Sequence, residues 1–213
     1  MKGHRLRNTT GSTRWNICTG SWALPPVRNY TFPRRLLYKY TTKSALVKAK
    51  IRIIILLMNA HIAAIHYLLT HRGGTVAVAE SCTGGLLAKL LTDTPGSSKY
   101  FVLGVVAYSN KAKNTILSIP VEIIEKYGAV SLETAKRMAE GIRTLAQSTY
   151  GIGITGIAGP SGTIPGKPVG TVCIAACSHH TLVCRQFHFK GSRQKIRELA
   201  CLQALAILKK VIG

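Results

Sequence analysis

The sequence predicts an α/β protein, a three-layer α/β/α sandwich built on a mixed β-sheet. From residue 59 onward, short apolar runs of strand length alternate with segments whose apolar residues recur at helical spacing. Near the carboxyl end two apolar runs follow each other with only Ser178–His180 between them, which indicates a hairpin and therefore an antiparallel pair. The chain of 213 residues is also long enough to bury a core without disulfide bonds.

The elements are expected in the following order. Helices are predicted at Ala60–His71, Thr83–Thr92, Ala112–Leu117, Val121–Tyr127, Ser131–Ser148 and Ser192–Val211, and strands at Thr75–Ala79, Tyr100–Tyr108, Tyr150–Ile154, Val169–Ala176 and Thr181–Phe189. The first helix is closed by Gly73-Gly74. Ser131–Ser148 has the clearest helical pattern, because Ser131 is a suitable N-cap and the apolar residues after it recur every three or four positions.

The amino-terminal part differs in kind from the rest. Residues 1–57 hold twelve Lys and Arg and no acidic residue, within a formal net charge of +22 for the chain. Such a segment is typical of a basic arm for nucleic acid, of an organelle transit peptide, or of a poorly ordered extension translated from a wrongly chosen start. We favour the extension, because a new pattern begins at Met58, and we place one domain at residues 58–213.

The remaining composition narrows the class of protein. The six cysteines have no regular spacing and nothing resembles a cleaved secretory signal, so we expect reduced thiols in a cytoplasmic protein. Cys173 and Cys177, followed by His179 and His180, offer an alternative zinc site, but their spacing fits no common finger and their neighbours are typical of a buried strand. No apolar run reaches the roughly 18 residues of a membrane span, so no membrane partner is expected.

Ser81 is the first candidate for chemistry. It follows an apolar strand and precedes a helix, which places its hydroxyl beside backbone N–H groups that can stabilise an oxyanion. Gly84 and Gly85 would let a substrate approach the backbone closely. The alternative is that Ser81 or Thr83 merely caps the helix, and the local pattern alone favours this alternative.

A serine nucleophile needs a base, and no acid–histidine pair is evident near Ser81. The segment Tyr108–Lys113 follows the next strand, so its start is expected at the same sheet edge. A lysine there acts as a base if burial or neighbouring cations lower its pKa, and Tyr108 is placed to relay a proton. The alternative is a solvated basic turn.

Two further segments have features of ligand sites. The loop Thr155–Gly162 follows a strand and is rich in glycine, as are many loops that accommodate phosphate, although it matches no dinucleotide or Walker fingerprint. Phe189–Arg197 enters the last helix, where its cations and the helix N-terminus could hold a phosphate. The alternative there is an ordinary basic helix start.

Together these segments resemble the CinA C-terminal domain family, the nicotinamide-nucleotide amidases. The matching pieces, in the order of the family, are Ala79–Gly85 (AESCTGG), Pro95–Ser98 (PGSS), Tyr108–Asn110 (YSN) with Lys113, Gly128–Ser131 (GAVS), Gly156–Pro160 (GIAGP) and Lys167–Val172 (KPVGTV). The resemblance covers roughly residues 59–213, and residues 1–57 have no counterpart in it.

The resemblance implies hydrolysis of the carboxamide of nicotinamide mononucleotide to nicotinate mononucleotide and ammonia, in pyridine-nucleotide salvage. It implies a Ser/Lys mechanism without metal or cofactor, and a homodimer or larger homo-oligomer. Carried onto this chain, Ser81 is the nucleophile, Lys113 the general base and Tyr108 the residue that assists proton transfer. The implied substrate-binding residues are Thr83, Gly84, Gly156, Ala158, Gly159, Arg193 and Arg197.

Two departures from the family pattern concern the substrate. Ser161 stands where the family commonly has an acidic residue, and Ser192 stands where it commonly has Asp in Gly-Asp-Arg. Both make the expected pocket less acidic, so an amidase of altered substrate is one alternative. A second alternative is a competence- or DNA-damage-associated protein that binds nucleic acid through residues 1–57.

Overall fold

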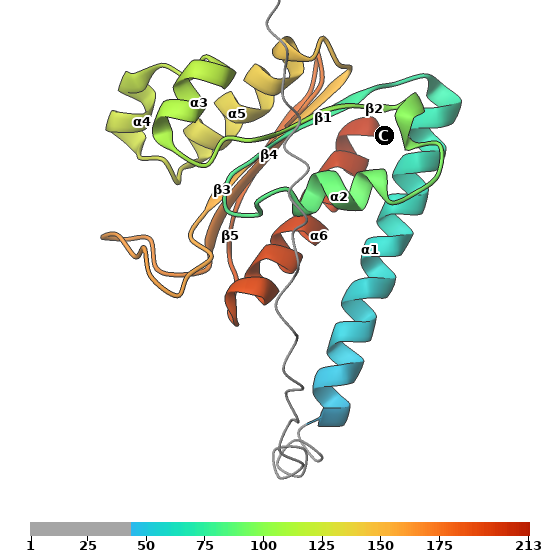
Figure 1. Cartoon of the computed structure of the whole chain (residues 1–213), viewed down its shortest axis with the longest axis horizontal. Coiled ribbons are helices and arrows are strands. Elements are labelled where there is room, and N and C mark those ends of the chain that lie inside the picture. Colours follow the sequence, from blue (N-terminus) through green and yellow to red (C-terminus); the bar gives the residue numbers. More distant parts are fainter. Residues whose placement is uncertain (1–43) are drawn as a thin grey trace, which may run out of the picture. The chain divides into compact units, whose positions relative to one another are not determined.

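The computed structural model describes residues 44–213 (Figure 1). The elements are α1 (Ser44–Arg72), β1 (Val76–Glu80), α2 (Leu86–Thr92), the short 3₁₀ helix η2 (Ser97–Lys99), β2 (Phe101–Val106), α3 (Asn110–Leu117), α4 (Val121–Tyr127), α5 (Leu132–Leu145), β3 (Tyr150–Gly156), β4 (Thr171–Cys177), β5 (Leu182–His188) and α6 (Arg193–Ile212). The sequence predicts a basic extension at residues 1–57. Of this extension, residues 1–43 lie outside the described residues.

The five strands form one mixed sheet in the order β2-β1-β3-β4-β5. β1 is parallel to both β2 and β3, whereas β3, β4 and β5 are successively antiparallel. The expected hairpin near residue 180 is the β4–β5 connection, where Cys177 lies opposite Leu182. The prediction of a mixed sheet is therefore confirmed.

Helices cover both faces of the sheet, which confirms the predicted three layers (Figure 1). One core cluster joins residues of α1, α2 and α6, among them Ile65, Leu87 and Leu205, to the strands. A separate cluster joins α3, α4 and α5 to the other face, with Leu117 and Met138 as fully or nearly fully buried members. The layers follow from the alternation of strand and helix in the sequence, because each helix has one apolar stripe to bury against a face of the sheet.

Helix α1 begins at Ser44, well before the residue 60 expected from periodicity. The expected domain boundary at Met58 lies inside this helix. Among the side chains described from Arg52 onward, that of Met58 is the first that is buried. From Met58 onward the helix packs against α6, and Arg72 Nη1 donates a hydrogen bond of 2.8 Å to the Ile212 carbonyl. By length and composition alone Arg52–Arg72 could cross a membrane. Within this segment Met58, Ile62, Ile65 and Leu69 are buried in the domain core, whereas Ile53, Ile55, Leu56 and Leu57 are exposed.

Helix α2 begins at Leu86, three residues later than the sequence predicts. The reason is that Gly84 and Gly85 have φ angles of 59° and 89°, which belong to a turn and not to a right-handed helix. Residues Ser81–Gly85 therefore form a separate turn between β1 and α2. It is called here the nucleophile turn, after the role that the family resemblance implies for Ser81. Its conformation decides where the hydroxyl of Ser81 lies.

Helix α5 lies so close to β3 that the strand has glycine at the points of contact. A Cβ added to Gly153 would lie 2.3 Å from the Ala135 carbonyl oxygen, whereas one added to Gly104 on β2 would meet only side chains, at 3.1 Å or more. We expect Gly153→Ala to lower the Tm by about 3–10 °C, because the backbone of α5 must move. Thermal unfolding followed by circular dichroism checks this. A smaller loss for Gly153→Ala than for Gly104→Ala would contradict the packing described.

Candidate active site

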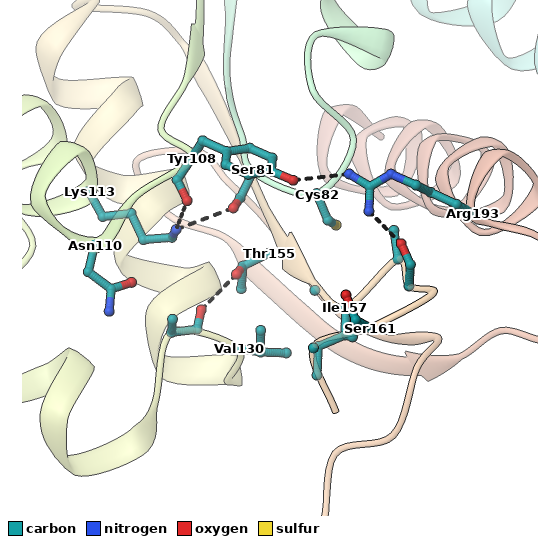
Figure 2. A pocket seen from close by; sticks show the side chains of 15 residues that line it. Ser81, Cys82, Tyr108, Asn110, Lys113, Val130, Thr155, Ile157, Ser161 and Arg193 are labelled. Carbon is teal, nitrogen blue, oxygen red and sulfur yellow. Dashed lines mark hydrogen bonds between the residues drawn. The ribbon is translucent and has the colours of Figure 1, made fainter. Parts of the chain in front are cut away.

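Several strands end at one edge of the sheet, and the residues that follow them line a cavity. β1, β2 and β3 are parallel, so the chain leaves all three at the same edge, and β5 also ends there because β4 and β5 each reverse direction. A cavity of about 240 Å³ lies at this edge. Its lining includes Ser81 after β1, Tyr108 after β2, Gly159 after β3 and Arg193 at the start of α6 (Figure 2).

The central contact of the cavity joins Ser81 and Lys113. Lys113 Nζ lies 3.2 Å from Ser81 Oγ, and the two residues are 2% and 8% exposed. Nζ also donates to the carbonyl oxygens of Ala107, at 3.1 Å, and Tyr108, at 3.4 Å. The helix that carries Lys113 is fixed at its start by Ser109, whose Oγ accepts the Ala112 N–H at 3.0 Å. The two carbonyl oxygens therefore hold the Lys113 amine in contact with the Ser81 hydroxyl.

The surroundings of Lys113 favour its neutral form. Burial lowers the pKa of the Lys113 ammonium from its ordinary value, because desolvation penalises the charged state. None of the ion pairs found among the described residues involves Lys113. A buried amine without a carboxylate partner can accept a proton from the hydroxyl that it contacts, which is the requirement for a general base.

Neither Ser81 nor Thr83 caps helix α2. The N-cap is Gly85, which has no side-chain capping bond. The first N–H groups of the helix are instead taken by the carboxylate of Glu80. The helix-cap alternative for Ser81 is therefore wrong, and its hydroxyl is free to contact Lys113 at the cavity.

Cys82 is a second nucleophilic group that lines the cavity. Its thiol is buried, and burial raises the pKa of Cys82 to about 12. At neutral pH the side chain is thus a thiol, whereas nucleophilic cysteines act as thiolates. Of these two adjacent residues, Ser81 is the one whose side chain has an amine in hydrogen-bond contact.

Tyr108 and Arg193 meet on the side of the cavity opposite to Lys113 (Figure 2). Arg193 Nη2 donates to the Tyr108 hydroxyl at 3.0 Å, and Nη1 donates to the Gly159 carbonyl at 2.7 Å. The expected proton relay would need the Tyr108 hydroxyl to contact Ser81 or Lys113. Within the described residues this hydroxyl accepts from Arg193 and makes no hydrogen bond with either of them. Tyr108 contacts Lys113 through its backbone carbonyl alone.

The other expected site residues divide into two groups. Gly156, Ala158 and Gly159 line the cavity, as does Arg193, whereas Thr83, Gly84 and Arg197 are not part of its lining. Thr83 is fully buried, and its carbonyl accepts hydrogen bonds from Arg197 Nε at 2.9 Å and Nη2 at 2.5 Å. Arg197 is thus directed at the protein backbone.

Sequence reasoning missed several residues of the lining. Asn110, Cys82 and Thr155 line the cavity but were not among the expected site residues. Asn110 lies beside Lys113 in Figure 2, and its place two residues after Tyr108 was the signal that could have identified it. Ser161, one of the two departures from the family pattern, also lines the cavity. Ser192, the other departure, caps α6 by accepting the Lys195 N–H at 3.3 Å.

The cysteines and histidines considered for zinc lie around the β4–β5 hairpin. Cys173 and Cys177 are buried in the core against α5, and His179 Nε2 lies 3.1 Å from Arg143 Nη1. Within residues 44–213 no three Cys, His, Asp or Glu side chains gather as metal ligands would. The hairpin residues are therefore used in packing and in a surface hydrogen bond.

The sequence matches the family model described as the CinA C-terminal domain over residues 58–212. A CinA-like protein of Desulfotalea psychrophila is 51% identical over 144 residues, which are 68% of this chain and 35% of that protein. A CinA-like protein of Anaeromyxobacter is 47% identical over 141 residues, 66% of this chain and 34% of that protein. This chain thus spans about a third of the length of the curated relatives it matches.

Solved structures give the same result for the fold. A competence or damage-inducible protein of Enterobacter asburiae superposes with a TM-score of 0.71 at 34% identity, over 73% of this chain and 98% of that one. A competence/damage inducible protein of Agrobacterium tumefaciens gives 0.72 at 34% identity, over 74% and 96%. The match to the family model, over residues 58–212, includes all the residues that line the cavity. The chain therefore belongs to the CinA C-terminal domain family.

Proposed function

We propose that this chain is an amidase that hydrolyses the carboxamide of nicotinamide mononucleotide to nicotinate mononucleotide and ammonia. The observation that carries the proposal is the buried contact of 3.2 Å between Lys113 Nζ and Ser81 Oγ. The resemblance to nicotinamide-nucleotide amidases supplies the substrate. On this basis the reaction belongs to pyridine-nucleotide salvage in the cytoplasm.

The reaction begins with proton transfer from Ser81 to neutral Lys113. The serine oxygen forms a bond to the carboxamide carbon, and the carbonyl electrons move onto the oxygen to give a tetrahedral intermediate. When this intermediate collapses, the C–N bond breaks and the nitrogen takes the proton from the Lys113 ammonium. Ammonia leaves, and the acyl group remains on Ser81 as an ester.

Water completes the reaction by the same route. Lys113, neutral again, accepts a proton from water while the water oxygen attacks the ester carbon. The bond between that carbon and Ser81 Oγ then breaks, the serine oxygen regains its proton from Lys113, and the acid product leaves. One water is consumed per amide, and Lys113 ends in its starting form.

The nucleophile turn supplies N–H groups for the developing oxyanion. Three of its N–H groups, those of Ser81, Gly84 and Gly85, already donate hydrogen bonds within the protein. Those of Cys82 and Thr83 donate to no backbone carbonyl or carboxylate in the described part of the chain. Of these two residues Cys82 is the one that lines the cavity, so its N–H is the donor available to an oxyanion formed next to Ser81 Oγ.

The charge of the cavity suits a phosphorylated substrate. Among the residues described as lining it, Lys113 and Arg193 are cationic and none is acidic. The proposed mechanism uses Lys113 in its neutral form, so Arg193 is the side chain proposed to bind the phosphate.

We expect Arg193→Met to raise the KM for nicotinamide mononucleotide about tenfold or more, through loss of a charge-assisted contact. Hydrolysis of nicotinamide riboside, which has no phosphate, should stay within about twofold of wild type under the same conditions. Lys190→Met, which removes an exposed cation outside the cavity, is the matched control. An equal effect of Arg193→Met on both substrates would exclude the phosphate contact.

The substrate is tested by incubating the purified full chain with a panel of amides and measuring ammonia. The panel contains nicotinamide mononucleotide, nicotinamide riboside, nicotinamide, glutamine and asparagine. The highest kcat/KM is expected for nicotinamide mononucleotide. Higher activity on another amide would show that Ser161 and Ser192 accompany a changed substrate, and absence of ammonia from every member would overturn the proposal.

A further inference from the structure

Glu80 is a buried acid that the reaction does not use. It lies at the end of β1, directly before Ser81, and is 1% exposed. Its Oε2 accepts N–H groups of Gly85 at 3.0 Å and Leu87 at 3.2 Å, and its Oε1 accepts that of Ala88 at 2.7 Å. Three backbone donors at a helix start thus replace the water lost on burial of this carboxylate. The carboxylate ties the far end of the nucleophile turn to the residue that precedes it.

Arg197 holds the same turn from α6. Its Nε and Nη2 both donate to the Thr83 carbonyl, the middle of the nucleophile turn. The guanidinium lies against Gly84, where an added Cβ would come within 3.3 Å of Arg197 Nη2. This contact joins residues 114 positions apart in the chain, so it fixes the turn to an element distant in the sequence.

The nucleophile turn needs such contacts because little else in its sequence makes it rigid. Gly84 and Gly85 both have positive φ angles, and glycine has the widest choice of backbone conformation. The position of Ser81 Oγ relative to Lys113 Nζ depends on this turn, as does the direction of the Cys82 N–H at the cavity. Displacement by about 1 Å of a reacting group can cost about 10²-fold in rate.

We propose that Glu80 and Arg197 are positioning residues that clamp the nucleophile turn, and that Arg197 acts through the Thr83 carbonyl instead of on the substrate. The inference rests on the proposed Ser81 chemistry. It assigns a role to Glu80, and it changes the role of Arg197 from the substrate contact that the family resemblance implies. Neither side chain touches the reacting atoms.

The test compares Glu80→Gln, Arg197→Met and Arg197→Lys in the full chain. Steady-state hydrolysis of nicotinamide mononucleotide gives kcat and KM, and mass spectrometry gives the rate at which a small fluorophosphonate labels Ser81. For Glu80→Gln and Arg197→Met we expect kcat and the labelling rate to fall about 10–100-fold, with KM within about twofold of wild type. Arg197→Lys keeps one donor and should recover part of both rates.

Glu198→Gln is the matched control, because it removes a charge from the neighbouring residue of α6 and should leave both rates unchanged. Lower Tm with wild-type kcat and labelling at 20 °C would show that the two residues serve stability only, and would overturn the proposal. A raised KM with normal labelling in Arg197→Met would show that Arg197 binds the substrate, and would overturn its role as a positioning residue.

The labelling assay also separates this inference from the proposed function. If wild type is labelled at Ser81 but releases no ammonia from nicotinamide mononucleotide, the proposed substrate is wrong. The labelling rates of the variants then still test whether Glu80 and Arg197 position the turn. If Ser81 of wild type reacts neither with the probe nor with any amide, the Ser81 chemistry on which the clamp rests is overturned.

Discussion

Replacing Ser81 by alanine is expected to lower ammonia release from nicotinamide mononucleotide by about 10³-fold or more. The change removes the oxygen that attacks the amide and leaves the backbone of the nucleophile turn intact. Alanine also fits the site without strain, because Ser81 is almost fully buried and is not a helix cap. The Tm should therefore stay close to that of wild type while the reaction is lost.

Two further variants decide whether the loss is specific to Ser81. Ser178→Ala removes a hydroxyl from the β4–β5 hairpin, at the opposite edge of the sheet, and should have wild-type activity. Cys82→Ala tests the neighbouring nucleophile and should retain measurable turnover. If Cys82→Ala abolishes ammonia release and Ser81→Ala does not, the reaction runs through the thiol and the assignment of Ser81 is wrong.

Replacing Lys113 by methionine is expected to lower kcat about 10²–10⁴-fold, the usual contribution of a general base. Methionine fills a similar volume but has no amine. Loss of the amine leaves Ser81 Oγ with no base in contact. Lys113→Arg should be equally inactive, because a guanidinium contacts the hydroxyl but stays protonated at any practical pH. Because the two residues act as a unit, the double variant Ser81→Ala/Lys113→Met should be little worse than either single variant.

The dependence on pH follows from the same residue. Lys113 acts in its neutral form, so kcat/KM should rise with pH through the pKa of its ammonium in the folded protein. Burial lowers that pKa below the ordinary lysine value of about 10.4. The rising limb should consequently be complete at a lower pH than for a solvated lysine, and it should vanish in the residual activity of Lys113→Met. A rate that falls as pH rises through this range would contradict a lysine base.

Most of the fold could be read from the sequence, because the apolar pattern is local. The strand at Val76–Glu80 and the helix at Leu132–Leu145 lie within or next to the predicted segments. The start of α1 could not be placed, since residues 52–57 are exposed apart from the half-buried Ile54 and form no buried stripe that a periodic pattern would indicate. The start of α2 was misplaced because residues Ser81–Gly85 belong to a glycine turn whose form depends on contacts from elsewhere.

The site was predicted unevenly for the same reason. Ser81 and Lys113 meet as the family resemblance implies, and neither residue alone carries that signal. The side-chain contacts of Arg197 and Tyr108 could not be foreseen, because each depends on a partner 85 or more positions away. Glu80 was overlooked because its partners are backbone N–H groups, which have no signature in a sequence.

The most direct test of Ser81 as the nucleophile is to trap the acyl-enzyme. The full chain is mixed with nicotinamide mononucleotide, quenched in acid within the first turnovers and digested, and the peptide that contains both Ser81 and Cys82 is sequenced by mass spectrometry. We predict an added nicotinate-mononucleotide acyl group on Ser81 in wild type and none in Ser81→Ala. An acyl group on Cys82, or ammonia release at an unchanged rate by Ser81→Ala, would contradict the Ser81–Lys113 mechanism.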